Sequence, residues 1–459
     1  MEEIDHLPGR MLRIATRRVG QLVVTVLVIV LFAVACRPAL FAPGANTYDA
    51  GVAVRWFDLS LDLVRETPGF TPPVASRAFA YLGVALYETV QPGLPGYRSL
   101  TGQLNELASV PRVNWWAGYH WPSAANAALA SLTRHLFPTA SPANLTAVDA
   151  LEEELAESFL AEVDVATHRR SVAFGRAVAD AIFAWSQTDG GHEGYARNFP
   201  DDYSLPVGPG LWVSTPPAYA KAMQPTWGEN RPFVLPDGNG CPALPPPAYS
   251  EDPNSAFYAE AAEVYQVGLT RTPEQTEIAK FWSDDPGLTS TPPGHWVAIL
   301  NQALTTEDAD LGLAAEAYAK LGVAVADSFI TCWYTKYNYN LVRPITYIQA
   351  VIDPGWNTPN ITDAVTTPPF PEYTSGHSVQ SGAAATVLAS VFGEGYAFTD
   401  DSHADLGLAA RSFTSFQAAA DEAAISRLYG GIHYRSAIEQ GLAQGQCVGD
   451  RVLALKFLR

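Results

Sequence analysis

Apolar side chains recur at helical spacing along most of this chain, and alternating runs of β-branched residues are nearly absent. Because residues three and four apart lie on one face of an α-helix, this spacing indicates amphipathic or buried helices rather than strands. The predicted helices span residues 52–64, 75–90, 122–136, 142–166, 166–187, 254–269, 272–282, 295–305, 308–347, 377–392, 406–429 and about 433–457. The pattern therefore predicts an all-α protein.

The first 36 residues have the pattern of a targeting segment. Four arginines precede an apolar run at 22–35 that is shorter than the roughly 20 residues of a membrane span. Ala33-Val34-Ala35-Cys36 resembles a bacterial lipobox that lacks its usual leucine, and it would make Cys36 a lipidated first residue. We expect either a lipoprotein anchored at Cys36 or an uncleaved N-terminal segment, with the catalytic part outside the cytoplasm in both cases.

Changes in composition divide the rest of the chain. A linker at 37–46 leads to an N-terminal helical half at 47–187, and a C-terminal helical half occupies 253–459. Between the halves lies a Pro/Gly-rich connection at 188–252, which is too long for an ordinary loop. This connection is either a structural wrap that joins the halves or a lid over a site.

Overall charge limits the possible partners. The chain has 459 residues, of which 48% are hydrophobic, and its net charge is −19. This acidic balance argues against nucleic acid and against anionic membrane surfaces as partners, so we expect membrane contact only through the N-terminus. After Cys36, the cysteines are Cys241, Cys332 and Cys447, which permit one disulfide whose pairing the sequence does not determine.

Three segments between residues 333 and 435 carry cations and histidines that stand out against this acidic balance. They contain Lys336 and Arg343 in the first, Ser375, Gly376 and His377 in the second, and Arg427 and His433 in the third. Each residue alone has an ordinary explanation as a solvated helix charge, a cap or a core histidine. Their occurrence together predicts a pocket for a compact oxyanion with His433 at its apex.

The spacing within each segment suggests how the pocket forms. Lys336 and Arg343 are seven residues apart, about two helical turns, and are expected to share one helix face before a break at Pro344. Ser375 and Gly376 form a turn that opens a helix, where free N–H groups favour an anion and glycine permits its close approach. Elsewhere, His295 is expected to begin a helix as a capping residue, or else to lie beside the substrate or directly behind the residues that contact it.

The three segments resemble a signature shared by the vanadium-dependent haloperoxidases and the type 2 phosphatidic acid phosphatases. Lys–six–Arg-Pro, Ser-Gly-His and Ser-Arg–five–His carry this resemblance. Trp333, Phe370 and the segment FWSDDPGLTSTPPGHW make it closest to vanadium chloroperoxidase. The resemblance extends from about Trp282 to the end of the chain, and it implies two helical bundles with long Pro/Gly-rich connecting loops.

The resemblance also implies a cofactor and a role for each residue. Vanadate would bind His433 through vanadium, and phosphate can occupy the same site. The groups expected to neutralise the oxyanion are Lys336, Arg343, Arg427, the Ser375 hydroxyl and the Gly376 N–H. His377 would act as acid–base while hydrogen peroxide oxidises a halide, Trp333 and Phe370 would form the apolar wall for that halide, and Asp285 would pair with Arg427.

One position departs from the shared signature, because Ala437 stands where both groups usually carry an aspartate that orients the apical histidine. Glu439 or a backbone carbonyl is the expected substitute. Two other functions remain open. One is an acid phosphatase in which His433 forms a phosphohistidine and His377 protonates the leaving oxygen. The other is an exported protein that binds phosphate-like anions without catalysis. The halide and the oligomeric state are left undetermined.

Overall fold

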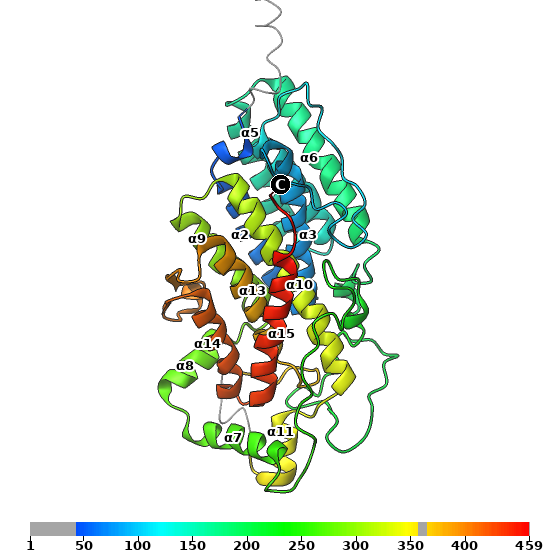
Figure 1. Cartoon of the computed structure of the whole chain (residues 1–459), viewed down its shortest axis with the longest axis vertical. Helices are drawn as coiled ribbons and strands as arrows, with labels where there is room; N and C mark the ends of the chain where they lie inside the picture. The colour runs from blue at the N-terminus through cyan, green and yellow to red at the C-terminus, as the bar shows by residue number, and fades with distance from the viewer. Residues whose placement is uncertain (1–42, 357–364, 459) are drawn as a thin grey trace, which may run out of the picture.

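The computed structural model describes residues 43–356 and 365–458, and these residues form a predominantly helical protein (Figure 1). Its longer helices are α2 (Gly51–Glu66), α3 (Pro72–Val90), α4 (Trp121–Leu136), α5 (Pro142–Leu160), α6 (Val165–Ser186), α7 (Ala256–Thr270), α8 (Pro273–Phe281), α9 (Thr291–Thr306), α10 (Leu311–Tyr339), α11 (Pro344–Tyr347), α13 (Gly376–Phe392), α14 (Phe416–Tyr429) and α15 (Arg435–Leu453). Short helical turns are η2 (Ala45–Thr47), η3 (Gln91–Gly93), η4 (Gly194–Ala196), η5 (Trp227–Glu229), η6 (Ile348–Ile352) and η7 (Ala404–Leu406). The predicted all-α fold is confirmed.

Two helices are shorter in the structure than the sequence predicted. Residues 406–413 do not begin α14, because β2 (Arg411–Phe413) pairs there antiparallel with β1 (Phe398–Asp400). The helix predicted over 308–347 ends at Tyr339, because Asn340 takes a left-handed conformation with φ 47°. Arg343 therefore lies beyond α10, at the N-cap of α11, and the prediction that it shares a helix face with Lys336 was wrong.

Helix α10 is the centre of the packing, since it contacts α3, α13 and α15 and most of its residues are buried (Figure 1). Glycines permit close helix contacts both at α10 and between α13 and α15. A Cβ on Gly83 of α3 would lie 2.4 Å from the carbonyl oxygen of Tyr318, and a Cβ on Gly445 of α15 would lie 2.0 Å from that of Val379. Glycine is required at both positions because any side chain would push the helices apart.

The Pro/Gly-rich connection both wraps α10 and borders a cavity. The buried carboxylate of Asp327 on α10 accepts the N–H groups of Phe233, Val234 and Leu235 at 2.6, 2.9 and 3.1 Å. These bonds satisfy both the carboxylate and an extended stretch of backbone. An earlier part of the connection, within residues 215–223, lines the cavity described below.

The fold determines which cysteines pair. Cys241 and Cys447 form a disulfide across 206 residues, and Cys332 is a buried free thiol. In the described chain, none of the helices combines the length and the apolar composition needed to cross a membrane. The predicted targeting segment at 1–36, with Cys36, lies outside the described residues.

Candidate active site

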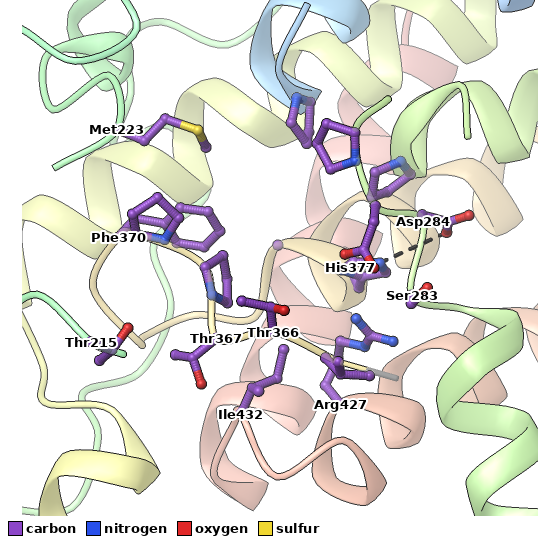
Figure 2. Close-up of a pocket in the computed structure, with 18 of the residues that line it drawn as sticks. Thr215, Met223, Ser283, Asp284, Thr366, Thr367, Phe370, His377, Arg427 and Ile432 are labelled. Atoms are coloured by element: carbon purple, nitrogen blue, oxygen red, sulfur yellow. Dashed lines mark ion pairs between the residues drawn. The ribbon is translucent and has the colours of Figure 1, made fainter. Parts of the chain in front are cut away.

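A cavity of about 280 Å³ opens among the ends of several helices (Figure 2). Most of the residues singled out in the sequence reach its wall, and these are Trp333, Phe370, Gly376, His377, Arg427, His433 and Asp285. The three others, Lys336, Arg343 and Ser375, are fully buried behind that wall. The structure thus gathers residues from α10, the loop before α13, α14 and the start of α15 around one space.

His433 sits between a cation and a carboxylate. Its Nε2 lies 3.2 Å from Nη1 of Arg343, and its Nδ1 lies 2.8 Å from Oε1 of Glu372. A guanidinium can only donate, so Nε2 accepts and the ring proton must be on Nδ1. Burial, followed by the nearby cations, holds the pKa of His433 well below its usual value. The ring is therefore neutral and keeps a lone pair on Nε2.

Glu372 fills the role left open by Ala437. Its Oε1 accepts both the His433 ring and the backbone N–H of Tyr434, the latter at 2.8 Å. The expectation that Glu439 or a backbone carbonyl would do so was wrong. Glu439 faces Arg435 at 3.8 Å, and the carbonyl of Ala437 accepts the N–H of Ser375 at 3.0 Å.

Sequence reasoning missed Glu372, although this residue lies inside the segment that was singled out. Its signal was an isolated glutamate five residues before His377, in an otherwise apolar and small-residue stretch. Burial raises the pKa of Glu372 to about 8, while Arg343 and Lys336 oppose that rise.

The cations behind the wall are held by carbonyl groups. Lys336 Nζ donates to the carbonyls of Pro371 at 3.1 Å, of Glu372 at 3.0 Å and of Thr374. Burial lowers the pKa of Lys336 to about 7, and the neighbouring Arg343 contributes to this shift. A positive charge in such a place is costly without an anion, so the site is suited to receive one.

Arg343 has one buried nitrogen whose hydrogen-bond donors are unused in the described chain. Its Nε and Nη1 donate to the carbonyls of Phe370 and Ile432, each at 2.9 Å, but its buried Nη2 has no partner among the described residues. Burial lowers the pKa of Arg343 to about 10, which still leaves the guanidinium charged at neutral pH. An unpaired donor beside the Nε2 lone pair of His433 fits a tetrahedral oxyanion.

The start of α13 supplies backbone donors to the same place. Ser375 is the N-cap, and its side chain accepts the N–H of Ser378 at 3.4 Å. A Cβ added to Gly376 would meet no protein atom closer than the Trp333 ring at 3.7 Å, so the space beside its backbone is open to a guest. The first N–H groups of a helix lack intrahelical partners and favour an anion.

His377 faces both a cation and an acid. Its Nε2 lies 3.8 Å from Oδ2 of Asp284, an ion-pair contact drawn in Figure 2. Burial and then Arg427 hold the pKa of His377 well below its usual value, whereas Asp284 opposes that shift. The expected ion pair between Asp285 and Arg427 is not present in the described chain, since their charged atoms are more than 4 Å apart. Arg427 is instead attracted by both Asp284 and Asp285 at longer range.

The opposite wall of the cavity is apolar. The rings of Trp333 and Phe370 lie 4.9 Å apart, and Met223 stands on the same side of the cavity. Several prolines complete this wall. The Phe370 ring also lies 4.9 Å from both Lys336 Nζ and the guanidinium carbon of Arg343. A small, weakly hydrated anion could therefore rest on the apolar face and still feel the cations behind it.

Comparison with known proteins relates this chain to one family. A family model described as the VCPO second helical-bundle domain matches residues 316–457. Vanadium chloroperoxidase of Curvularia inaequalis is 26% identical over 400 residues, which are 73% of this chain and 64% of that protein. This chain thus spans just under two thirds of the length of that relative.

Solved structures agree with this comparison. A structure described as the first bacterial vanadium-dependent iodoperoxidase superposes with a TM-score of 0.79 at 42% identity, covering 88% of this chain and 97% of its own. A holo-type bacterial vanadium-dependent chloroperoxidase superposes with a TM-score of 0.64 at 14% identity, covering 84% and 92%. The second likeness shows a shared fold alone.

Glu372→Gln should weaken oxyanion binding about 10- to 100-fold, because an amide can turn its NH2 group toward Nδ1 of His433 and then no longer holds the ring proton there. Calorimetric titration with orthovanadate measures this loss. Glu439→Gln is the matched control, since Glu439 has an exposed side chain away from the cavity and should bind as the natural chain does. Equal affinities for Glu372→Gln and the natural chain would contradict the assigned role of Glu372.

Sulfate binding should weaken as the pH rises through about 7 and 8. Lys336 loses its positive charge above about pH 7, and Glu372 gains a negative charge above about pH 8, while sulfate keeps its charge. Each group can contribute a slope approaching one decade of affinity per pH unit. Titration of sulfate from pH 6 to 9 should show that Lys336→Met removes the first step. An unchanged pH profile in Lys336→Met would rule out this origin.

Proposed function

The chain belongs to the vanadium-dependent haloperoxidase family, and from this premise we propose that it oxidises halide ions with hydrogen peroxide at the cavity closed by His433. The observation that carries the proposal is the Nε2 lone pair of His433, fixed by Glu372 and placed 3.2 Å from Nη1 of Arg343, whose other terminal nitrogen, Nη2, has no partner among the described residues. This arrangement offers one bond to an electrophilic centre and several donors to its oxygens.

The residues present fit vanadate. His433 would bind the vanadium. The groups that would hold its oxygens are Lys336, Arg343, Arg427, the Ser375 hydroxyl and the Gly376 N–H. Bound vanadate supplies a Lewis acid that activates hydrogen peroxide toward a halide without a change in its own oxidation state. Phosphate has the same shape and can occupy the same place.

The protein's own side chains would stabilise negative charge on the bound oxygens and transfer protons. Lys336, Arg343 and Arg427 withdraw electron density from the bound oxygens, and their burial strengthens this effect because little water screens them. His377 lines the cavity as a largely neutral base, so its ring can take a proton from hydrogen peroxide and return it to the oxygen that leaves as water. The proton thus passes between hydrogen peroxide and a side chain that lines the cavity.

We propose iodide as the preferred halide. Trp333, Phe370 and Met223 form an apolar wall, and a large halide loses the least hydration energy on entering such a space. The solved structure at 42% identity, described as an iodoperoxidase, supports the same choice.

We also propose that the protein is exported and is held at a membrane through a lipid on Cys36 or through an uncleaved N-terminal segment. The charged and apolar pattern of residues 1–36 supports this, and so does the Cys241–Cys447 disulfide, since disulfides persist in oxidising compartments. Cells fed a palmitate analogue should label the natural chain but not Cys36→Ser. Equal labelling of both chains, or no labelling of either, would argue against the lipid anchor.

Protein freed of vanadate by dialysis should form triiodide from iodide and hydrogen peroxide only after vanadate is added back. Phosphate should inhibit this activity by competing for the site. His433→Ala should lose at least 100-fold in kcat/KM, because the bond to the cofactor is gone. A chain that hydrolyses p-nitrophenyl phosphate and shows no vanadate-dependent iodide oxidation would instead be a phosphatase using a phosphohistidine. Phosphate binding without either activity would indicate a non-catalytic binder.

A further inference from the structure

Behind His377 lies a second group of buried titratable side chains that the proposed reaction does not use. It consists of Asp284 just after α8, His295 in the second turn of α9, Asp400 at the end of β1 and His403 just before η7. These residues come from three stretches of sequence, with Asp400 and His403 in the same one, and each is buried. The expectation that His295 caps a helix was wrong, because it lies inside α9, whose N-cap is Ser290. The other expectation, that it lies directly behind the residues of the site, agrees with its contact to Asp284.

The hydrogen bonds of His295 define its charge. Its Nδ1 lies 3.0 and 3.1 Å from the two oxygens of Asp284, and its Nε2 lies 2.8 Å from Oδ2 of Asp400. Ionised carboxylates accept and do not donate, so both ring nitrogens carry protons and His295 is an imidazolium. Although burial lowers it, the two carboxylates together raise the pKa of His295 to about 10.

The same contacts fix Asp284 in place. Its Oδ1 also accepts Nε2 of His403 at 3.0 Å. Asp400, at the far end of the cluster, accepts the N–H and the hydroxyl of Ser402 at 3.0 and 2.6 Å. The ring of His295 stacks on Trp282 at 4.5 Å, which prevents it from turning. Asp284 therefore has little freedom to change its orientation.

Asp284, Asp400 and the His295 imidazolium together carry one negative charge. Two carboxylates and one imidazolium leave a single charge, and the remaining side of Asp284 presents it to His377, 3.8 Å from a ring nitrogen that has no hydrogen-bond partner in the described chain. Figure 2 shows the two side chains directed toward each other. The charged or titratable groups that face His377 are Arg427 on α14, Asp284 and Asp285 after α8, His295 on α9 and His433 before α15.

We propose that Asp284 is a positioning residue for His377, and that the imidazolium of His295, held between Asp284 and Asp400, is the clamp that keeps Asp284 in place. The inference rests on the proposed function only in taking His377 as the acid–base group. A fixed anion opposite Nε2 orients the His377 ring, and it stabilises the imidazolium that forms when His377 takes a proton beside Arg427. Sequence reasoning named the neighbouring Asp285 only as a partner of Arg427 and assigned no acid to His377, whereas the structure places Asp284 opposite its ring.

The test is a double-mutant cycle on iodide oxidation by the vanadate-loaded protein. Asp284→Asn should lower kcat about 10- to 100-fold and change KM for iodide by less than about twofold, because it alters proton transfer and not halide binding. In a His377→Ala background the same change should have no further effect. Asp400→Asn should act in the same direction more weakly. Asp401→Asn, the same change at an exposed neighbour, should leave kcat as it is.

A second measurement does not depend on activity. Nuclear magnetic resonance of protein labelled with ¹⁵N-histidine should show one histidine, absent from His295→Gln, with both ring nitrogens protonated at pH 8. Asp284→Asn should abolish that signal and shift the ring nitrogens of His377. A neutral His295 in the natural chain would overturn the proposal.

Three other outcomes would also overturn it. Asp284→Asn could reduce the residual activity of His377→Ala by the same factor, which would mean that Asp284 acts only on the fold. It could also leave kcat unchanged. Purified protein could contain one divalent metal ion that Asp284→Asn loses, which would make Asp284, His295 and His403 ligands of that ion. Absence of iodide oxidation in the natural chain would contradict the proposed function alone, and the cycle would then be measured on phosphate ester hydrolysis.

Discussion

Burial of positive charge around one cavity is the constraint on which the rest of this structure depends. Lys336 and Arg343 are fully buried, and neither has a carboxylate within ion-pair distance among the described residues. Backbone carbonyls from the loop at 370–374 and from Ile432 solvate them instead. That loop must run past the end of α10 to bring its carbonyls to the two cations, so the electrostatics of the site constrain the path of the chain. A bound oxyanion would supply the negative charge that the cations lack.

Two histidines then acquire different roles from their surroundings. His433 has a cation on one nitrogen and Glu372 on the other, which leaves a neutral ring with a directed lone pair. His377 has Arg427 nearby and the anionic Asp284 opposite its free nitrogen, which suits a ring that takes and returns protons. Two groups of the same type can be assigned different acid–base roles when their environments shift their pKa values differently. Each histidine depends on an acid supplied by a distant segment.

At Ala437, the one position that departs from the shared signature, another segment of this chain supplies the contact to His433. Ala437 cannot orient His433, yet its carbonyl still receives the N–H of Ser375 and so holds the helix start near the site. The carboxylate comes instead from Glu372, on the loop that carries Phe370 and Ser375. Glu372 can reach His433 from this loop because the loop and the segment that begins α15 lie against each other.

The sequence by itself determined the helical architecture, the anion-binding character of the site and most of its members. These features can be seen in the sequence because they are local, namely helical periodicity, small residues within helices and short motifs with fixed spacing. It could not determine that Arg343 lies beyond the end of α10, since one left-handed residue, Asn340, decides that. Nor could it identify Glu372, Asp284 as the acid opposite His377, or the clamp formed by His295 and Asp400. Those contacts join residues 11 to 105 positions apart, and only the packing of the helices brings such side chains within hydrogen-bonding distance.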